Sequence, residues 1–165
     1  MGEVKLVPLE QWFCDTCQNV IKSAKEGWIE WRTDKDGNAS DFRICHQMMY
    51  SPLREKRGDE GCYQYGKVSK GDMHLNTFVG VRGMVEMLAW IDVGRALDPK
   101  GTAPTLRIGD IRNWADTFRR LQIPHYEEAR RYFPKAYQDG EFADENEIGP
   151  FLKDRLIGII HKYGP

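Results

Sequence analysis

The motif Cys14-Asp15-Thr16-Cys17 constrains the fold of this chain more than any other feature of its sequence. A tight turn between two cysteines lets both thiolates reach one tetrahedral metal ion, with zinc–sulfur bonds of about 2.3 Å. A complete tetrahedral site needs two more ligands. Cysteines and histidines that can supply them follow between residues 45 and 74. The sequence therefore predicts a structural zinc ion bound within the N-terminal half.

Four residues compete for the two remaining ligand positions, and they are Cys45, His46, Cys62 and His74. Side chains alternate between the two faces of a strand, so if Phe42 and Ile44 face the core, His46 shares their side and Cys45 points away. The predicted set of zinc ligands is Cys14, Cys17, His46 and Cys62. The substitute ligands, should one of these not bind, are Cys45 and His74.

The four cysteines could serve other purposes than metal binding. Two disulfides would require export, but Met1 to Pro8 lack the basic and apolar regions of a secretion signal. We therefore expect a cytoplasmic protein, in which thiols stay reduced. The residues Trp12 to Cys17 resemble the thioredoxin-like Trp-Cys-x-x-Cys motif, but that motif follows a central strand, for which the preceding residues leave little room. Buried free thiols are the remaining alternative, because cysteine is often buried as a small apolar residue.

The charge and hydropathy of the chain argue against general attraction to DNA and against insertion into a membrane. The chain has 24 basic and 25 acidic residues, so it has no large overall field that would attract DNA or an anionic membrane. No segment reaches the roughly 18 consecutive apolar residues of a membrane-spanning helix. We expect no membrane partner, and a nucleic-acid site would have to be a local patch.

Residues 27–32 and 41–46 are rich in β-forming side chains and predict an antiparallel hairpin. The turn between them contains Asp36-Gly37, a dipeptide that tolerates the positive φ of a hairpin turn. Residues 51–72 are charged and rich in glycine, and they predict a long loop. A loop of that length in a compact domain is usually functional or anchored. Cys62 is the expected anchor.

Helical periodicity begins at residue 75. The first apolar stripe consists of Phe78, Val81, Met84, Val85, Leu88 and Ile91. A second helix is predicted from the N-cap Asp110 to Leu121, a third over 124–133, and a last one over 148–163, after an acidic connector at 139–147. The predicted fold class is α+β. A zinc-stabilised β-hairpin module spans residues 1–74, and a helical half of about four helices spans residues 75–165.

The N-terminal module resembles zinc-ribbon and treble-clef modules, in which a cysteine knuckle precedes a hairpin and the second ligand pair follows. The resemblance rests on Cys14, Cys17 and the hairpin, and the chain departs from it by having no second Cys-x-x-Cys. In those families the metal is structural and the module mostly binds nucleic acid or protein. The resemblance thus implies a binding module.

The second and third predicted helices are joined by a short turn, as in a helix-turn-helix. Four arginines make this region basic and are candidate nucleic-acid contacts: Arg119, Arg120, Arg130 and Arg131. The competing interpretation is a pair of bundle helices whose outer faces carry arginine, because the turn lacks glycine and Glu127-Glu128 would repel phosphates.

The expected function is that of a non-enzymatic binding or regulatory protein with an unknown protein or nucleic-acid partner. The alternatives are DNA binding by the helical half and a metal-dependent enzyme with three protein ligands and a water on zinc. The enzyme would need an acid or base, for which Asp15, Glu30 and Glu60 are available. Homo-oligomerisation through the aromatic-rich surface is a further expectation that the sequence leaves open.

Overall fold

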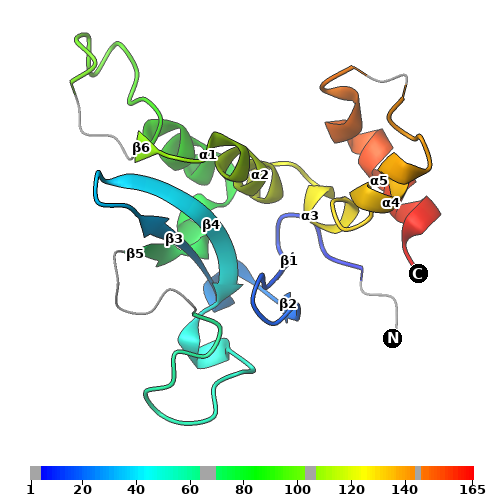
Figure 1. The fold of residues 1–165 in the computed structure, drawn as a ribbon, viewed down its shortest axis with the longest axis horizontal. Helices are drawn as coiled ribbons and strands as arrows, with labels where there is room; N and C mark the ends of the chain where they lie inside the picture. The colour runs from blue at the N-terminus through cyan, green and yellow to red at the C-terminus, as the bar shows by residue number, and fades with distance from the viewer. Residues whose placement is uncertain (1–4, 64–69, 103–106, 144–145) are drawn as a thin grey trace.

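The computed structural model describes residues 5–63, 70–102, 107–143 and 146–165 (Figure 1). These residues contain two sheets and five α-helices, which confirms the α+β class and corrects the expected number of helices. Parts of the predicted loop over 51–72 and of the connector over 139–147 lie outside the described residues.

The larger sheet is built on the predicted hairpin, which the structure confirms. Strands β3 (Gly27–Thr33) and β4 (Asn38–His46) are antiparallel, and Gly37 in their turn has a φ of 82°. Strand β5 (Lys70–His74) pairs with β3, and β6 (Arg107–Ile108) runs parallel to β4, giving the order β5-β3-β4-β6. The end of the predicted loop is therefore a strand, which its charged and glycine-rich sequence does not indicate.

One face of this sheet packs against helices α1 (Gly80–Ala89) and α2 (Ile111–Gln122) (Figure 1). Aromatic rings fill the space between the layers. The ring centroids of Trp31 and Trp90 are 5.0 Å apart, and those of Phe42 and Trp114 are 4.8 Å apart. Aromatic side chains bury large apolar areas, so this contact supplies much of the core.

Helix α2 begins as predicted, because the carboxylate of Asp110 accepts hydrogen bonds from the amides of Arg112 and Asn113. The helix expected from residue 75 is shorter, with a 3-10 turn at Leu75–Phe78 before α1.

The apolar stripe predicted for the first helix lies mostly on the surface of α1. Val81 is 77% exposed, Val85 60% and Leu88 50%. The opposite face of the helix is inside, where Gly83 fits because a Cβ atom there would lie 1.9 Å from the carbonyl carbon of Phe78. A glycine gives no apolar signal in the sequence, so the periodicity indicated a helix but not which face is buried.

The C-terminal helices form a second cluster. They are α3 (Tyr126–Ala129), α4 (Phe133–Gln138) and α5 (Lys153–Tyr163). The prediction of one helix over 124–133 was wrong, because His125 adopts a left-handed conformation with a φ of 69° and α3 has four residues. Pro134 lies in the first turn of α4, where its missing N–H has no cost.

The main core contains residues from both sides of position 74. Trp12 and Ile29 share one buried cluster with Phe78, Trp114 and Leu121. The second cluster consists of residues from α3 and α5, including Tyr126, Leu156 and Ile159. The sheet and the first two long helices therefore pack around a common core.

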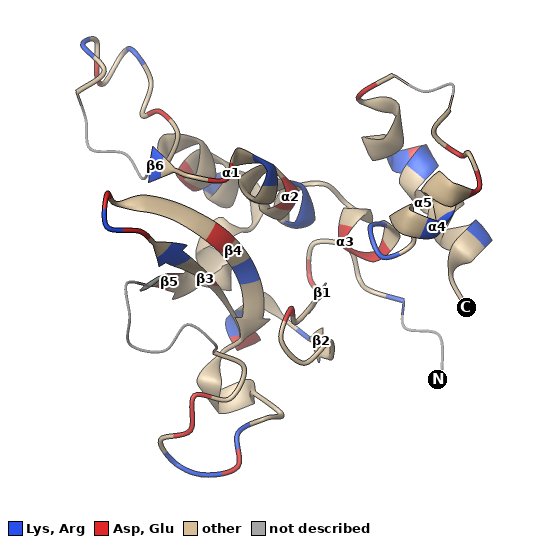
Figure 2. Cartoon of the chain, in the orientation of Figure 1, with Lys and Arg blue, Asp and Glu red and all other residues tan. Residues whose placement is uncertain are grey.

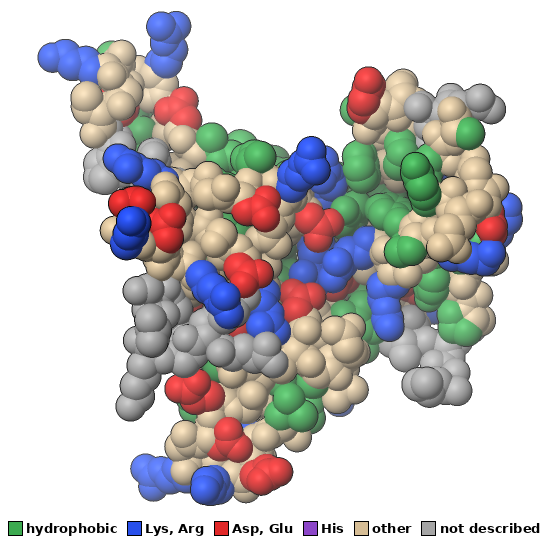
Figure 3. All heavy atoms as spheres, viewed as in Figure 1, with side chains coloured by type: hydrophobic (Ala, Val, Ile, Leu, Met, Phe, Trp, Pro, Cys, Tyr) green, Lys and Arg blue, Asp and Glu red, His purple; other side chains and the backbone are tan. Residues whose placement is uncertain are grey.

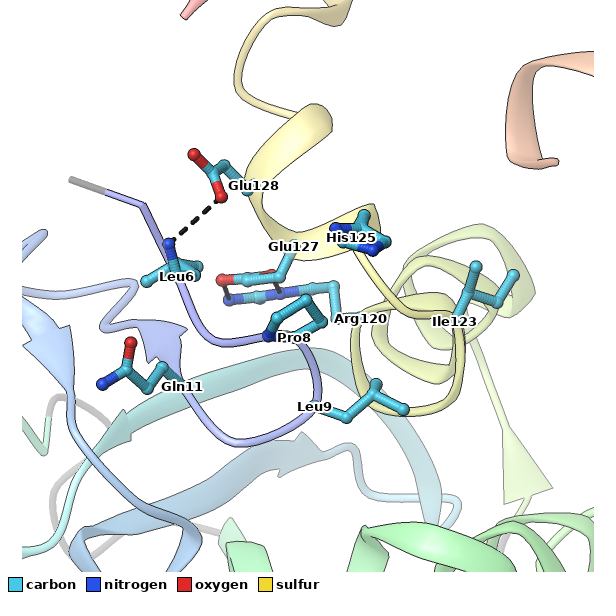
Figure 4. Close-up of a pocket in the computed structure, with 9 residues that line it drawn as sticks. All are labelled: Leu6, Pro8, Leu9, Gln11, Arg120, Ile123, His125, Glu127 and Glu128. Carbon is cyan, nitrogen blue, oxygen red and sulfur yellow. Dashed lines mark hydrogen bonds and ion pairs between the residues drawn. The ribbon is translucent and has the colours of Figure 1, made fainter. Parts of the chain in front are cut away.

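A buried ion network connects the N-terminal segment to α2 and α3. Arg120, only 3% exposed, donates from Nε and Nη2 to the carboxylate of Glu127 at 2.6 and 3.0 Å. Its Nη1 donates to Asp15 at 2.7 Å, and Nη2 also reaches the carbonyl oxygen of Phe13. Figure 4 shows the Arg120 side chain lying between Glu127 and the N-terminal segment, whose Leu6 amide donates to Glu128. Every part of the guanidinium thus has a partner, as a buried charge requires.

We expect Arg120→Met to destabilise the protein by about 3–5 kcal/mol, because it leaves the carboxylates of Asp15 and Glu127 with one cation fewer in a buried site. Chemical denaturation followed by circular dichroism measures the change. The matched control is Arg112→Met in the same helix, where an exposed arginine should contribute within about 0.5 kcal/mol. Equal stability losses in the two variants would contradict the role given to Arg120.

Candidate metal centre

The Cys-x-x-Cys motif forms the turn of a small hairpin. Strands β1 (Trp12–Phe13) and β2 (Val20–Ile21) are antiparallel, and the motif lies between them. The Cys14 amide donates to the carbonyl oxygen of Asn19, and the Gln18 amide donates to that of Cys14, both at 2.9 Å. Gln18 closes the turn with a φ of 62°. This hydrogen-bonded turn holds the two cysteines of the motif on one side of the chain.

The structure brings together the four residues predicted as zinc ligands. Cys14, Cys17, His46 and Cys62 each offer one ligand atom, and these atoms all lie within 4.8 Å of one another. His46 Nδ1 is 3.5 Å from Cys17 Sγ and 3.7 Å from Cys62 Sγ. Tetrahedral zinc with bonds of about 2.0–2.3 Å would place its ligand atoms about 3.5–3.8 Å apart. The arrangement of donors can therefore hold a metal ion.

The imidazole of His46 is oriented for this role. Its Nε2 lies 3.3 Å from the carbonyl oxygen of Val20, and its Nδ1 faces the thiols. A backbone carbonyl accepts only from a protonated ring nitrogen, so the neutral ring has its proton on Nε2 and its lone pair on Nδ1. Metal-binding histidines are commonly fixed in this way by a hydrogen bond from the other nitrogen.

Further polar contacts fix the loop that carries Cys62. The hydroxyl of Ser51 donates to Cys62 Sγ at 3.0 Å, and that of Thr16 donates to the Cys62 carbonyl oxygen at 2.7 Å. Arg43 in turn donates to the Thr16 oxygen. Sequence reasoning missed Ser51 and Thr16, since isolated hydroxyl residues carry no pattern of their own. The position of Thr16 inside the Cys-x-x-Cys motif was the one sequence feature that could have indicated its role.

The thiols differ in acidity in the metal-free protein. Burial raises the pKa of Cys14, but hydrogen bonds from His46 and from backbone amides outweigh it and lower that pKa to about 6. Burial raises the pKa of Cys62 to about 12, despite the hydrogen bond from Ser51, and burial also raises the pKa of Cys17. Burial acts to lower the pKa of His46, but the hydrogen bond and charge of Cys14 raise it above its ordinary value. The metal-free site therefore retains protons that a metal ion would displace.

The two substitute ligands lie elsewhere. Cys45 is buried in the core cluster and, as strand alternation predicts, does not join the group of four. Burial and then the charge of Glu30 raise the pKa of Cys45. His74 packs on Trp28 with ring centroids 4.1 Å apart.

The four arginines proposed as nucleic-acid contacts all interact within the chain. Arg120 and Arg130 both contact Asp15 and Glu127. Arg119 lies over the ring of Phe151 at 4.3 Å, and Arg131 lies over that of Phe13 at 4.0 Å. On the face drawn in Figure 3, basic and acidic side chains are interspersed.

Comparison with known proteins identifies no relative: no protein-family model, curated protein or solved structure matches this chain. Among the described residues, no helix has the length and apolar character needed to cross a bilayer.

We expect metal binding to release protons and to weaken as the pH falls. Cys17 and Cys62 have raised pKa values and are thiols at neutral pH in the metal-free protein, and the raised pKa of His46 favours its protonated form. Each must lose its proton to bind, so binding near pH 7 should release about two to three protons. Calorimetric titration with Zn²⁺ in buffers of different ionisation enthalpy measures this number. An affinity that is the same at about pH 6 and about pH 8 would contradict the assignment of these ligands.

Proposed function

We propose that this protein is a non-enzymatic binding or regulatory protein whose N-terminal module is held by one structural zinc ion. The observation that carries the proposal is the group of four donors, Cys14, Cys17, His46 and Cys62, whose ligand atoms lie within 4.8 Å of one another. Four protein ligands in a tetrahedral arrangement are typical of structural zinc sites.

Zinc is the metal that this donor set favours. Three thiolates and one imidazole are soft and borderline ligands, which suit zinc better than calcium or magnesium. The charged loop over 51–62 extends away from the sheet (Figure 2) and has only Ser51 and Cys62 buried. A short, polar segment buries too little apolar surface to be ordered alone, and metal binding can supply the missing stability.

The closed donor set favours a structural metal over a catalytic one. A catalytic zinc site keeps one position for water, whereas here the protein supplies four donors. Of the acids considered for catalysis, Asp15 is paired with Arg120 and Arg130. Glu30 is completely buried, on the sheet strand β3. The carboxylates of Asp15 and Glu30 are therefore not placed to activate a zinc-bound water.

The partner we propose is another protein rather than DNA. The contacts of Arg119, Arg120, Arg130 and Arg131 account for these side chains without a nucleic acid, and Arg120 is too buried to reach a phosphate. The order of a cysteine knuckle, a hairpin and a second ligand pair agrees with a zinc-ribbon or treble-clef type of module. Such modules include many that bind proteins.

The test is the metal content of variants that remove one ligand at a time. The purified protein should contain about one zinc per chain by elemental analysis, and Cys14→Ser, Cys17→Ser, His46→Ala and Cys62→Ser should each lose most of it. Removal of the metal by a chelator should also disorder the 51–62 loop, and the loop should then be cleaved faster by proteases.

The matched controls are Cys45→Ala and His74→Gln, which change the same residue types outside the group of four. Both should retain about one zinc per chain. Zinc loss in Cys45→Ala with retention in Cys62→Ser would refute the ligand set. A protein with no metal and four freely reacting thiols would refute the proposal as a whole.

A further inference from the structure

A second candidate site lies beside the metal centre. A cavity of about 330 Å³ opens where β3 and β5 meet the segment that follows β4. Its walls are formed by Trp28, Gln47, Met48, Met49, Glu60, Tyr63 and Asp72. Small-molecule sites in proteins typically measure about 300–1,000 Å³, so this cavity has room for a small group. In Figure 1, the segment that follows β4 lies below the ends of these strands.

Aromatic and sulfur-containing side chains form the apolar part of the wall. The rings of Trp28 and Tyr63 meet edge to face, with centroids 5.9 Å apart and planes inclined by 67°. Met48 and Met49 also line the cavity, in the 3-10 turn Met48–Tyr50. Aromatic faces attract cations through their quadrupole, and thioethers are polarisable. Together they can solvate a cation that carries apolar substituents.

The charged side chains among the described residues that line the cavity are acidic. Glu60 and Asp72 are acidic, and none of the described residues that line the cavity is basic. Glu30, fully buried in the sheet, pairs in register with Asp72 and adds a third carboxyl group on the same side of the sheet. Two basic residues lie nearby: Arg43 is opposite Glu30 in register, and Arg54 donates to Met49 Sδ at 2.8 Å. The acidic side chains at the cavity itself are Glu60 and Asp72. An anionic ligand would be repelled here, whereas a cation would be attracted.

We propose that this cavity binds a methylated ammonium group, such as a trimethylated lysine side chain of a partner protein. A trimethylammonium group has no N–H donors and is weakly hydrated, so aromatic rings with nearby carboxylates can replace its water. An unmodified lysine ammonium is compact and strongly hydrated, so it would lose more hydration free energy on entering the cavity. The inference rests on the proposed function, because it specifies the partner of the zinc-stabilised module.

Two of the candidate metal ligands adjoin the wall of the cavity in sequence. Gln47 follows the ligand His46 in sequence, and Tyr63 follows the ligand Cys62. A zinc ion joining these two ligands would hold together the two segments that form one side of the cavity. Ligand binding should therefore weaken when the metal is removed.

The experiment is a calorimetric titration of the full-length, zinc-loaded protein with a short uncharged peptide that contains one trimethyllysine. The comparison peptide carries the neutral isostere, in which a carbon atom replaces the charged nitrogen. We expect the charged peptide to bind at least about tenfold more tightly. Trp28→Leu, which keeps an apolar side chain but removes the ring, should weaken binding about tenfold.

Charge variants keep the test valid if Trp28→Leu fails to fold. Asp72→Asn and Glu60→Gln should each weaken binding of the charged peptide about threefold to tenfold and leave the neutral isostere unchanged. The control Glu55→Gln changes an exposed carboxylate in the same loop that does not line the cavity, and it should bind normally.

Equal affinities for the charged and neutral peptides would overturn the inference, as would no binding of the charged peptide at about 10 mM. Zinc is measured on the same sample, so a loaded protein that does not bind the peptide refutes the cavity alone. A sample without zinc refutes the proposed function. The comparison of the charged and neutral peptides, and the binding of the charged peptide itself, then still decide whether the cavity binds the cation.

Discussion

The buried guanidinium of Arg120 is the contact on which the arrangement of the sheet and the helices depends. It joins Asp15 of the cysteine turn to Glu127 of α3, and Arg130 reinforces both carboxylates from the same helix pair. Burial alone would raise the pKa of Asp15, but the charge of Arg120 outweighs it and holds that pKa below its usual range. A network of this kind is costly to break, because removing one charge leaves its partners buried and uncompensated.

The same network places the metal centre. Asp15 lies between Cys14 and Cys17, and its amide and carboxylate exchange two hydrogen bonds with the backbone of Ile44, at 2.8 and 2.7 Å. Ile44 is two residues before His46 on β4. The cysteine turn is thus fixed to the strand that supplies the histidine, and the helices fix the turn. Preorganised ligands of this kind reduce the ordering cost of metal binding, so helix packing and metal affinity should support each other.

Local patterns predicted the parts of the structure that depend on local geometry. The hairpin followed from its β-forming residues and the Asp36-Gly37 turn, and the choice of His46 over Cys45 followed from strand alternation. The N-cap of α2 at Asp110 was also predicted correctly, because helix capping depends on a single side chain at the start of the helix.

Long-range pairing could not be read in the same way. Arg120 and Arg130 looked like surface charges, because Asp15 lies 105 and 115 residues away from them in sequence. Strands β5 and β6 have sequences that do not suggest strands, and they form because β3 and β4 offer free edges. The first stripe of apolar residues marked a helix correctly but not its buried face, which is set by the close packing of Gly83. The cavity beside Trp28 is lined by residues from four separate stretches of the chain, so no single sequence motif indicates it.

The coordination shell of the zinc-loaded protein is the most direct test of the proposed ligand set. X-ray absorption at the zinc edge, recorded on the purified protein, reports the identity, number and distance of the ligand atoms. Coordination by three cysteines and one histidine should give three sulfur atoms at about 2.3 Å and one nitrogen at about 2.0–2.1 Å, with no oxygen from water. A shell with two sulfur atoms, or with an oxygen in place of a protein ligand, would contradict a closed site formed by Cys14, Cys17, His46 and Cys62.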